Sequence, residues 1–478
     1  MHTMKSRTIP LRTLIISLCI VGMFLEISGL IWSSKKDKPS ETFLKLTEPV
    51  PHVLDNPLEN GYFLLLGFAA ASGADPVQVG YDIWLEADGR SLPQEFDFEK
   101  PGRSELRVPV GIDDVLPEWK ASNPLEEFQR RDALFRTSAA RYRILLQRYD
   151  QWLRMRFEDW GYAHTGAPRV EELMSTHRLY VADGFAQQSR LGLERLTRDV
   201  TRWRIVLREA RTLSMKVLAE VMLEDDVEFL SRLISQPTVD RTLLTQALHL
   251  LQPLTRSEYS LRWPVQSEFV LGYRREQRSD RTLIPQERRD NSTTASLARA
   301  AHLQPELFKT VEHPRTHRFF GMSSASQRTW DTYAMFYDAT IKAADSVHSP
   351  LPKLRDVARD SPLTLLERMT NPLEFDPNWE PFAQRLVETD ARLRLASLQI
   401  LLRNPATTAT IPTRLAEVGS MYFDPFTGFP MLWSPTQKRL YSVGKDGLDD
   451  GGDPTFDISV PLTPAMDPSM AVAKRAAR

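Results

Sequence analysis

Apolar residues recur at helical spacing through the middle of the chain, and this pattern predicts a body built of α-helices. At residue 123 the sequence Asn-Pro-Leu-Glu provides an N-cap, a proline for the first helical position and a glutamate for a capping box. Aromatic residues then return every seven positions, at Phe128, Phe135, Tyr142 and Tyr149. Because this spacing places them on one face, it predicts a single helix of about thirty residues that packs an aromatic stripe into the core.

A second stripe, in steps of three and four residues, predicts a long helix over 193–210. Such stripes are buried most simply by antiparallel hairpins, so residues 123–255 are predicted to form an irregular helical bundle without a fixed repeat. The shorter helices expected in this bundle span residues 171–186, 215–222, 227–234 and 243–251.

The regions around the bundle show shorter patterns. Apolar patches predict two short helices, at 63–71 and 77–85. A polar, arginine-containing stretch over 263–294 predicts a long exposed loop. The remaining predicted helices span residues 295–310, 327–346 and 381–403, the last of which ends before Pro405.

An apolar run over residues 11–32 predicts a transmembrane helix. Its length of about twenty residues suffices to cross the hydrocarbon core of a bilayer. A cleaved signal peptide is the alternative, but the run is longer than the apolar part of such peptides. Basic residues lie on both sides of the run, so the short N-terminal tail decides the orientation, with the N-terminus in the cytoplasm and the bulk of the chain outside it.

Charge and cysteine content exclude several classes of function. The 478 residues include 61 basic and 62 acidic side chains, for a formal charge of -1, which gives no global reason to expect a nucleic-acid partner. The single cysteine, Cys19, excludes an intrachain disulfide and a cysteine-rich zinc site.

Local signatures of catalysis are missing from the sequence, which contains no GxGxxG, Walker A, HExxH or GxSxG motif. His313 and His317 have the spacing of one helix face, but Pro314 between them argues against a helix that shares a metal. The adjacent Asp225 and Asp226 are interpreted as caps at the start of a helix.

The sequence therefore predicts a non-catalytic protein. The alternative is a hydrolase whose site is assembled from dispersed residues, for which His164, His177 and Asp183 are the first candidates. The two classes differ in their surfaces, because an enzyme requires a deep pocket with convergent polar groups and a scaffold requires an exposed groove or apolar patch.

The C-terminal end carries the densest pattern. A DPFTG turn at residues 424–428 is followed by alternating residues over 439–443, an Asp/Gly loop and an apolar stretch over 456–460, which together predict a small antiparallel sheet. Glycines allow tight turns and carboxylates supply hard oxygen ligands, so the loop suits a calcium ion. Its five carboxylates are Asp446, Asp449, Asp450, Asp453 and Asp457.

This order of helix, turn, strand, acidic loop and closing Asp-Ile resembles the C-terminal half of the type II secretion major pseudopilin. The resemblance covers about the last eighty residues and implies that the loop binds calcium and fixes the sheet against the preceding helix. It also implies that Ser442, Asp446 and Asp457 occupy matching positions, while Asp449, Asp450 and Asp453 lie in the variable acidic part. The membrane segment lies far from this module and lacks a prepilin cleavage site, so the chain is not expected to be a pilus subunit.

Two other interpretations of the loop stay open. An EF-hand would place Asp446, Asp450, Gly451 and Asp457 at loop positions one, five, six and twelve, but Leu448 falls at position three, where a ligand is needed. A glycine-rich turn with solvated aspartates needs no ion at all.

As a whole the chain resembles single-span proteobacterial envelope proteins that have an anchor, a helical body and this ending. We therefore expect a mainly α fold with a small C-terminal α+β module, in a single-pass inner-membrane protein whose bulk is periplasmic. The expected function is a non-catalytic scaffold that binds a protein of the envelope, in secretion or envelope assembly. The predicted parts are a cytoplasmic tail (1–10), the membrane helix (11–32), a linker (33–60), short helices (61–122), the bundle (123–255), a loop-rich helical region (256–362), a helix with the small sheet (363–462) and a disordered tail (463–478).

Overall fold

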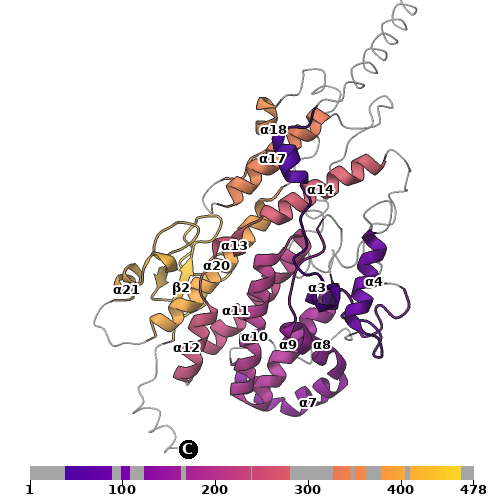
Figure 1. Ribbon diagram of the computed structural model, residues 1–478. Coiled ribbons are helices and arrows are strands. Elements are labelled where there is room, and N and C mark those ends of the chain that lie inside the picture. Colours follow the sequence, from indigo (N-terminus) through magenta and orange to yellow (C-terminus); the bar gives the residue numbers. More distant parts are fainter. Residues whose placement is uncertain are drawn as a thin grey trace, which may run out of the picture.

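The computed structural model describes residues 38–88, 98, 100–107, 123–162, 168–237, 239–279, 327–345, 350–361, 378–403 and 410–463. Within these ranges the chain is mainly helical, with one small antiparallel sheet near its C-terminal end (Figure 1), which confirms the predicted fold class at that level. The predicted membrane helix at 11–32 and the predicted helix at 295–310 lie outside the described residues. No helix among the described residues has the length and apolar character needed to cross a bilayer.

Helices make up most of the described chain. In chain order they are α2 (Glu41–Thr47), η1 (Pro57–Glu59), α3 (Gly61–Leu66), α4 (Pro76–Asp88), α6 (Pro124–Arg130), α7 (Asp132–Arg141), α8 (Arg143–Arg154), α9 (Val170–Gln187), α10 (Ser189–Glu209), α11 (Leu213–Ile234), α12 (Arg241–Leu250), α13 (Arg256–Tyr259), α14 (Arg262–Ser279), α17 (Gln327–Ala344), α18 (Leu354–Val357), η3 (Ala358–Asp360), α20 (Glu380–Leu401), α21 (Ile411–Glu417) and η4 (Ser420–Tyr422). The strands are β1 (Leu432–Ser434), β2 (Arg439–Ser442) and β3 (Ile458–Pro461).

The predicted thirty-residue helix is divided into α6, α7 and α8. The backbone leaves helical geometry at Arg131 (φ -106°, ψ 18°) and at Tyr142 (φ -100°, ψ 21°). The aromatic stripe is nevertheless confirmed as core, since Phe128, Phe135 and Tyr149 are fully buried. All three segments contact α9, and the two bends allow one apolar face to follow that helix.

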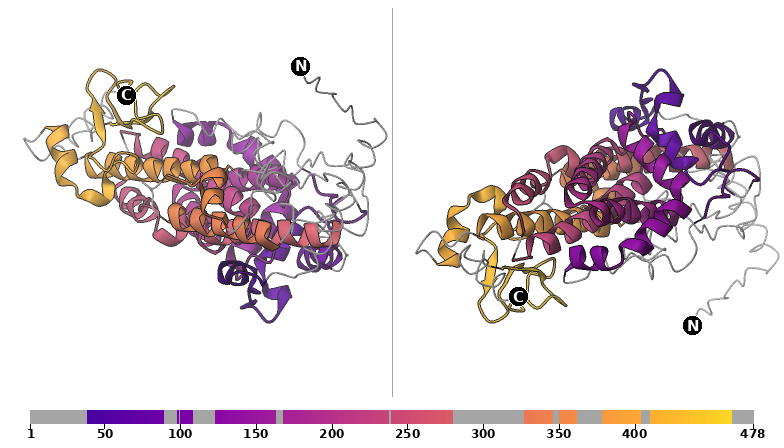
Figure 2. Two further views of the ribbon diagram at one scale, coloured as in Figure 1. Left: turned by 90° about the horizontal axis from the view of Figure 1, so that it is seen from above. Right: turned by 90° about the horizontal axis from the view of Figure 1, so that it is seen from below.

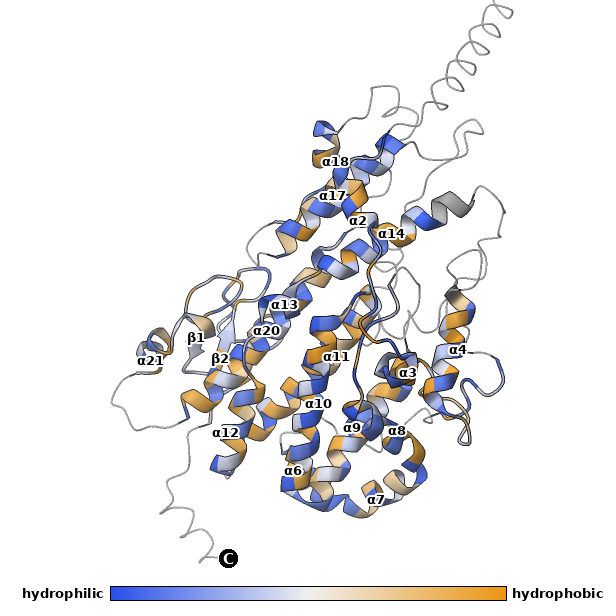
Figure 3. Ribbon diagram, viewed as in Figure 1, coloured by the Kyte–Doolittle hydropathy of each residue, from blue (hydrophilic) through white to orange (hydrophobic). Residues whose placement is uncertain are grey.

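Helices α9, α10 and α11 form the centre of the body. Each packs against the next, as hairpins of consecutive helices require. Helix α11 is continuous where two helices were predicted, because Asp225 and Asp226 lie inside it and do not cap it. It is buried on nearly all sides, and Figure 3 shows hydrophobic positions along most of its length.

Helices α2, α14 and α17 pack together. Two of them, α2 and α14, lie where the sequence analysis predicted a linker and a loop. Phe43 of α2 makes edge-to-face contacts with Phe269 and Tyr273 of α14, and both α14 residues contact Trp330 of α17. Helix α2, which buries Phe43 and Leu46, is thus a packed element within the predicted linker, and α14 is a helix within the predicted exposed loop. Short or charged helices of this kind are stabilised by tertiary burial and not by their own propensity.

The sheet has the strand order β1-β2-β3 and is antiparallel throughout. Leu432 pairs with Tyr441 across β1 and β2, and Ser442 pairs with Ile458 across β2 and β3. The residues of β2 and β3 overlap the two predicted segments, 439–443 and 456–460. Both strands contact α20. The C-terminal module, residues 410–463, lies at one end of the helical body in all views (Figures 1 and 2).

Helix α20 contributes to two hydrophobic cores. Phe382 and Leu393 belong to the large core of the body. Leu398 belongs to a smaller core, together with Leu440 of β2 and Val460 of β3. The same helix therefore packs against both the body and the module.

Helices α3 and α4 approach each other closely at glycines. We therefore expect that a methyl group added at such a glycine destabilises the protein. A Cβ at Gly80 would lie 1.8 Å from the carbonyl oxygen of Phe63, whereas a Cβ at Gly73 would meet nothing within 4 Å. Alanine is favoured over glycine in a helix by about 1 kcal/mol, but displacing a packed backbone costs about 1–3 kcal/mol or more. Gly80→Ala should therefore lower the free energy of unfolding in a urea titration, while the control Gly73→Ala should change it by less than about 0.5 kcal/mol. Equal midpoints for the two variants would contradict this packing.

Candidate functional site

The centre of the body encloses a cluster of one histidine and three aspartates. His177 lies on α9, Asp199 on α10, and Asp225 and Asp226 on α11. His177, Asp199 and Asp226 are fully buried, and Asp225 is nearly so. His177 Nδ1 lies 2.5 Å from Asp199 Oδ2, while Nε2 lies 3.3 Å from Asp225 Oδ2 and 3.6 Å from Asp226 Oδ1.

Neighbouring side chains hold two of these carboxylates in place. The Tyr149 hydroxyl donates to Asp199 Oδ1 at 2.6 Å and accepts a hydrogen bond from Trp203 Nε1 at 2.9 Å. Arg178 donates to both oxygens of Asp225, each at 2.8 Å. Asp199 and Asp225 are therefore oriented from two further sides of the cluster.

The ionisation of the cluster follows from its burial. Burial opposes the charge on His177, but the carboxylates of Asp199 and Asp226 outweigh it and raise the pKa of His177 well above its ordinary value. Burial, with the nearby Asp199, raises the pKa of Asp226. Burial also opposes the charge on Asp225, yet hydrogen bonds from His177 and Arg178 lower its pKa to about 2.

The two predicted hydrolase residues that the structure describes, His177 and Asp183, do not pair with each other. His164 lies outside the described residues, as do His313 and His317. Asp183 pairs with Arg195 at 2.7 Å and not with His177. Since His177 and its carboxylate neighbours have almost no exposed surface, a substrate has no access to them.

Sequence reasoning missed Asp199 and misinterpreted Asp225 and Asp226 as helix caps. A signal for Asp199 was present, because it lies three residues after Leu196 and four before Trp203, on the stripe predicted to face the core. Among the described residues, the only group of three ligand side chains with atoms within 4.8 Å of one another is His177, Asp199 and Asp226.

The carboxylates of the C-terminal loop do not converge in this way. Asp446, Asp449 and Asp453 each accept a hydrogen bond from the backbone amide two residues ahead, in local turns. Asp457 is buried and accepts from the Gly452 amide at 2.7 Å. The calcium ligand set of the loop therefore stays a prediction.

The other predicted loop residues have separate surroundings. Asp450 is exposed. Ser442 is fully buried, its Oγ accepts from the Gly444 amide at 3.1 Å, and its hydroxyl hydrogen-bonds to Asp424. Gly447 and Gly451 have φ of 68° and 71°, so the glycines supply the left-handed turns expected of them.

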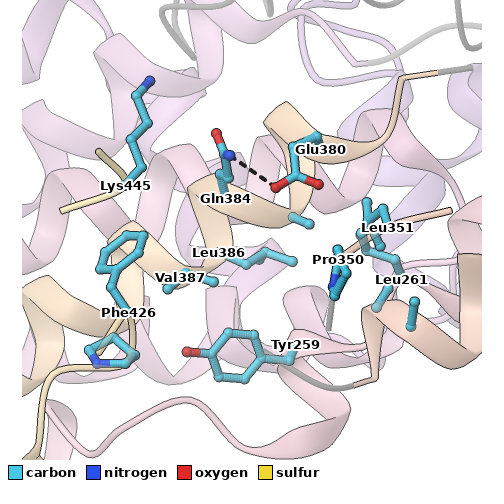
Figure 4. A pocket seen from close by; sticks show the side chains of 14 residues that line it. Tyr259, Leu261, Pro350, Leu351, Glu380, Gln384, Leu386, Val387, Phe426 and Lys445 are labelled. Carbon is cyan, nitrogen blue, oxygen red and sulfur yellow. Dashed lines mark hydrogen bonds between the residues drawn. The ribbon is translucent and has the colours of Figure 1, made fainter. Parts of the chain in front are cut away.

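A hollow of about 340 Å³ lies where the module meets the body (Figure 4). Most of its wall is apolar, and Phe426 of the module forms one side. Three of its polar side chains are engaged in hydrogen bonds, since Gln384 Nε2 donates to Glu380 Oε1 at 3.0 Å and the Tyr259 hydroxyl donates to Asp390 Oδ2 at 2.7 Å. Lys445 also lines the hollow. This lining does not provide the convergent reactive groups of a catalytic pocket.

Lys216 on α11 is a fully buried basic residue, and nothing in the sequence indicated its burial. Its Nζ donates to the carbonyl oxygens of Leu207 at 2.8 Å and Glu258 at 2.6 Å. Burial lowers its pKa from 10.5 to about 7, although Glu258 opposes the shift. The adjacent cavity measures only about 10 Å³, which is too small for a substrate.

No protein-family model matches the chain, and no curated protein or solved structure is significantly similar to it. The resemblance of the C-terminal segment to the major pseudopilin therefore stays a prediction, as does the wider resemblance to single-span envelope proteins.

The depressed pKa of Lys216 makes stability depend on pH in a predictable direction. Below about pH 7 both the folded and the unfolded chain hold the proton, so the penalty of a buried ammonium is fully present. Between about pH 7 and 10 only the unfolded chain holds it, so stability rises with pH, by at most about 1.4 kcal/mol per pH unit. Urea unfolding of Lys216→Met at pH 7, 8 and 9 should lack this rise, while the exposed control Lys342→Met should retain it. An identical slope in Lys216→Met and the wild type would contradict the assignment.

Proposed function

We propose that this protein is a non-catalytic interaction protein of the bacterial envelope, tethered through residues 11–32. In this proposal the helical body and the C-terminal module lie in the periplasm, and the module binds a protein partner in secretion or envelope assembly. The apolar run of the sequence supports the tether. The surface of the module supports the interaction.

The observation that carries this proposal is the distribution of exposed apolar side chains. Of the ten large apolar side chains that are exposed among the described residues, five belong to the C-terminal module, although the module is a small part of the chain. They are Met421, Phe429, Leu432, Leu448 and Phe456. Concentrated apolar exposure of this kind favours a protein-binding surface.

The two phenylalanines are the strongest candidates for anchors of the interface. Phe429 is 71% exposed and follows the turn at Gly428, and Phe456 is 64% exposed in the connection between β2 and β3. An aromatic ring loses little conformational entropy on binding and buries a large area, which is why aromatic residues dominate protein interfaces. The occupant we propose is therefore a folded partner with apolar pockets for these rings.

A calcium ion in the Asp/Gly loop would stabilise the same surface, because Phe456 lies in that loop. The candidate ligands are Ser442, Asp446, Asp449, Asp450, Asp453 and Asp457. The exposed carboxylates would have to turn toward one another, and the glycine-rich backbone permits such a rearrangement. The ion would act as a structural clamp, since an all-oxygen cage leaves no position for a substrate.

The docking proposal predicts that polar replacements of the aromatic anchors abolish partner capture. The full chain would be used to capture proteins from detergent-solubilised membranes, with and without a chelator. A specific protein should bind to the wild type and be lost from the double variant Phe429→Ser/Phe456→Ser. The matched control is Val53→Ser, which alters a side chain that is 69% exposed outside the module. Equal capture by all three proteins, or no specific capture by the wild type, would contradict the proposal.

The calcium proposal predicts two different effects on the melting temperature. Asp446→Ala should abolish the rise that calcium produces relative to EDTA, with little change in EDTA alone, because Asp446 is exposed. Asp457→Ala should also lower the melting temperature in EDTA, because it removes the acceptor of the Gly452 amide. Asp55→Ala, an exposed aspartate outside the loop, is the control. If calcium shifts Asp446→Ala as much as the wild type, the loop is only a turn.

A further inference from the structure

Asp226 is the least satisfied polar group of the central cluster. Its side chain is fully buried, and neither carboxylate oxygen accepts a hydrogen bond from a donor group among the described residues. The nearby carboxylate of Asp199 can form a hydrogen bond with it only if the two share a proton. A buried carboxylate without partners is costly unless a cation or a proton compensates it. Its Oδ1 lies 3.6 Å from His177 Nε2, so the side chain points into the cluster.

In the protonation state that a metal ion requires, with a neutral His177 and ionised aspartates, the cluster has two negative charges in excess. Asp199, Asp225 and Asp226 together carry three negative charges when ionised, and Arg178 supplies one positive charge through its pair with Asp225. With a neutral imidazole at His177 the cluster therefore has a net charge of -2. One divalent cation would cancel this charge.

We propose that His177, Asp199 and Asp226 bind a divalent transition-metal ion in the centre of the helical body. One atom from each side chain already lies within 4.8 Å of the others. Metal–ligand distances of about 2.0–2.2 Å require ligand atoms roughly 3 Å apart, so the three side chains need to move by only about an ångström. Imidazole with two carboxylates is a donor set that suits Zn²⁺, Mn²⁺ or Fe²⁺ and not the all-oxygen preference of Ca²⁺.

The surrounding contacts supply the second layer that metal sites require. A ligating histidine normally donates its other ring N–H to a carboxylate, and a ligating carboxylate is normally hydrogen-bonded as well. If Nδ1 binds the ion beside Asp199, then Nε2 faces Asp225, which Arg178 holds with two hydrogen bonds. The hydroxyl of Tyr149 already donates to Asp199.

The ion would be structural. Its ligands come from three consecutive helices, α9, α10 and α11, so it would cross-link the centre of the body. Burial of all three ligands leaves no route for a substrate to an open coordination position.

The competing explanation is a cluster neutralised by protons alone, and Asp226→Asn separates the two. The amide resembles a protonated carboxyl group in shape and lack of charge. In the proton-only cluster this variant should therefore melt at the same temperature as the wild type or higher. In the metal site it removes a ligand, so it should lose both the ion and the stability that the ion provides.

The test uses the purified full chain in mild detergent, stripped of metal with a chelator and titrated with Zn²⁺ or Co²⁺. The wild type should bind about one ion per chain, show visible absorption bands with Co²⁺ and gain about 5 °C in melting temperature with Zn²⁺. Asp226→Asn should show none of these responses. Tyr149→Phe should weaken Co²⁺ binding by about 10- to 100-fold, as expected for a group that orients a ligand.

Two controls separate this site from its neighbours. Asp183→Asn alters a buried aspartate on α9 that pairs with Arg195 and not with the cluster, so this variant should retain the Co²⁺ bands. Asp446→Ala, in the C-terminal loop, should retain them as well. The proposal is overturned if the wild type neither binds Co²⁺ nor responds to Zn²⁺, or if Asp226→Asn binds Co²⁺ as tightly as the wild type.

Discussion

Helix α20 has to complete two hydrophobic cores at once, and the relation between the helical body and the C-terminal module depends on it. Its 22 residues extend over about 33 Å. Leu393 and Ala396 pack into the body, while the interleaved Leu395 and Leu398 pack into the module. A helix that is apolar on opposite sides cannot expose either side without loss, so the two cores stabilise each other through it. The exposed apolar residues of the module are therefore presented from a fixed base and not from a flexible tail.

Buried polar contacts set the register of this arrangement, which apolar packing alone specifies poorly. The amide of Gln399 on α20 accepts from Ser231 of α11 and donates to the carbonyl oxygen of Pro461 in β3, so one side chain connects the body, the helix and the sheet. Asp390 accepts from the Leu254 amide and from the Tyr259 hydroxyl on the opposite side of the helix. Sliding α20 by one turn would leave these buried groups without partners, at about 1–3 kcal/mol each.

Features that depend on neighbours in sequence could be predicted, whereas features that depend on tertiary contacts could not. Asn123 caps α6, because its side chain accepts a hydrogen bond from the backbone amide of Glu126. Its position directly before a proline predicted this cap. The aromatic stripe was correctly assigned to the core. The bends at Arg131 and Tyr142 were missed, because they follow from packing on α9 and not from a helix-breaking residue. The same holds for α2 and α14, whose burial depends on aromatic residues far along the chain.

The C-terminal loop and the His177 cluster show the same difference between local and tertiary contacts. In the C-terminal loop, Asp446, Asp449 and Asp453 bond to amides two residues away, so their density in the sequence reflects local turns. In the bundle, the partner of His177 on Nδ1 is Asp199, which lies on the next helix, and no acidic run marks it. What marks it is a carboxylate at a position of a stripe otherwise occupied by apolar residues. Burying such a group requires compensation, so a single acid on a buried helix face points to a site more strongly than a dense run on the surface.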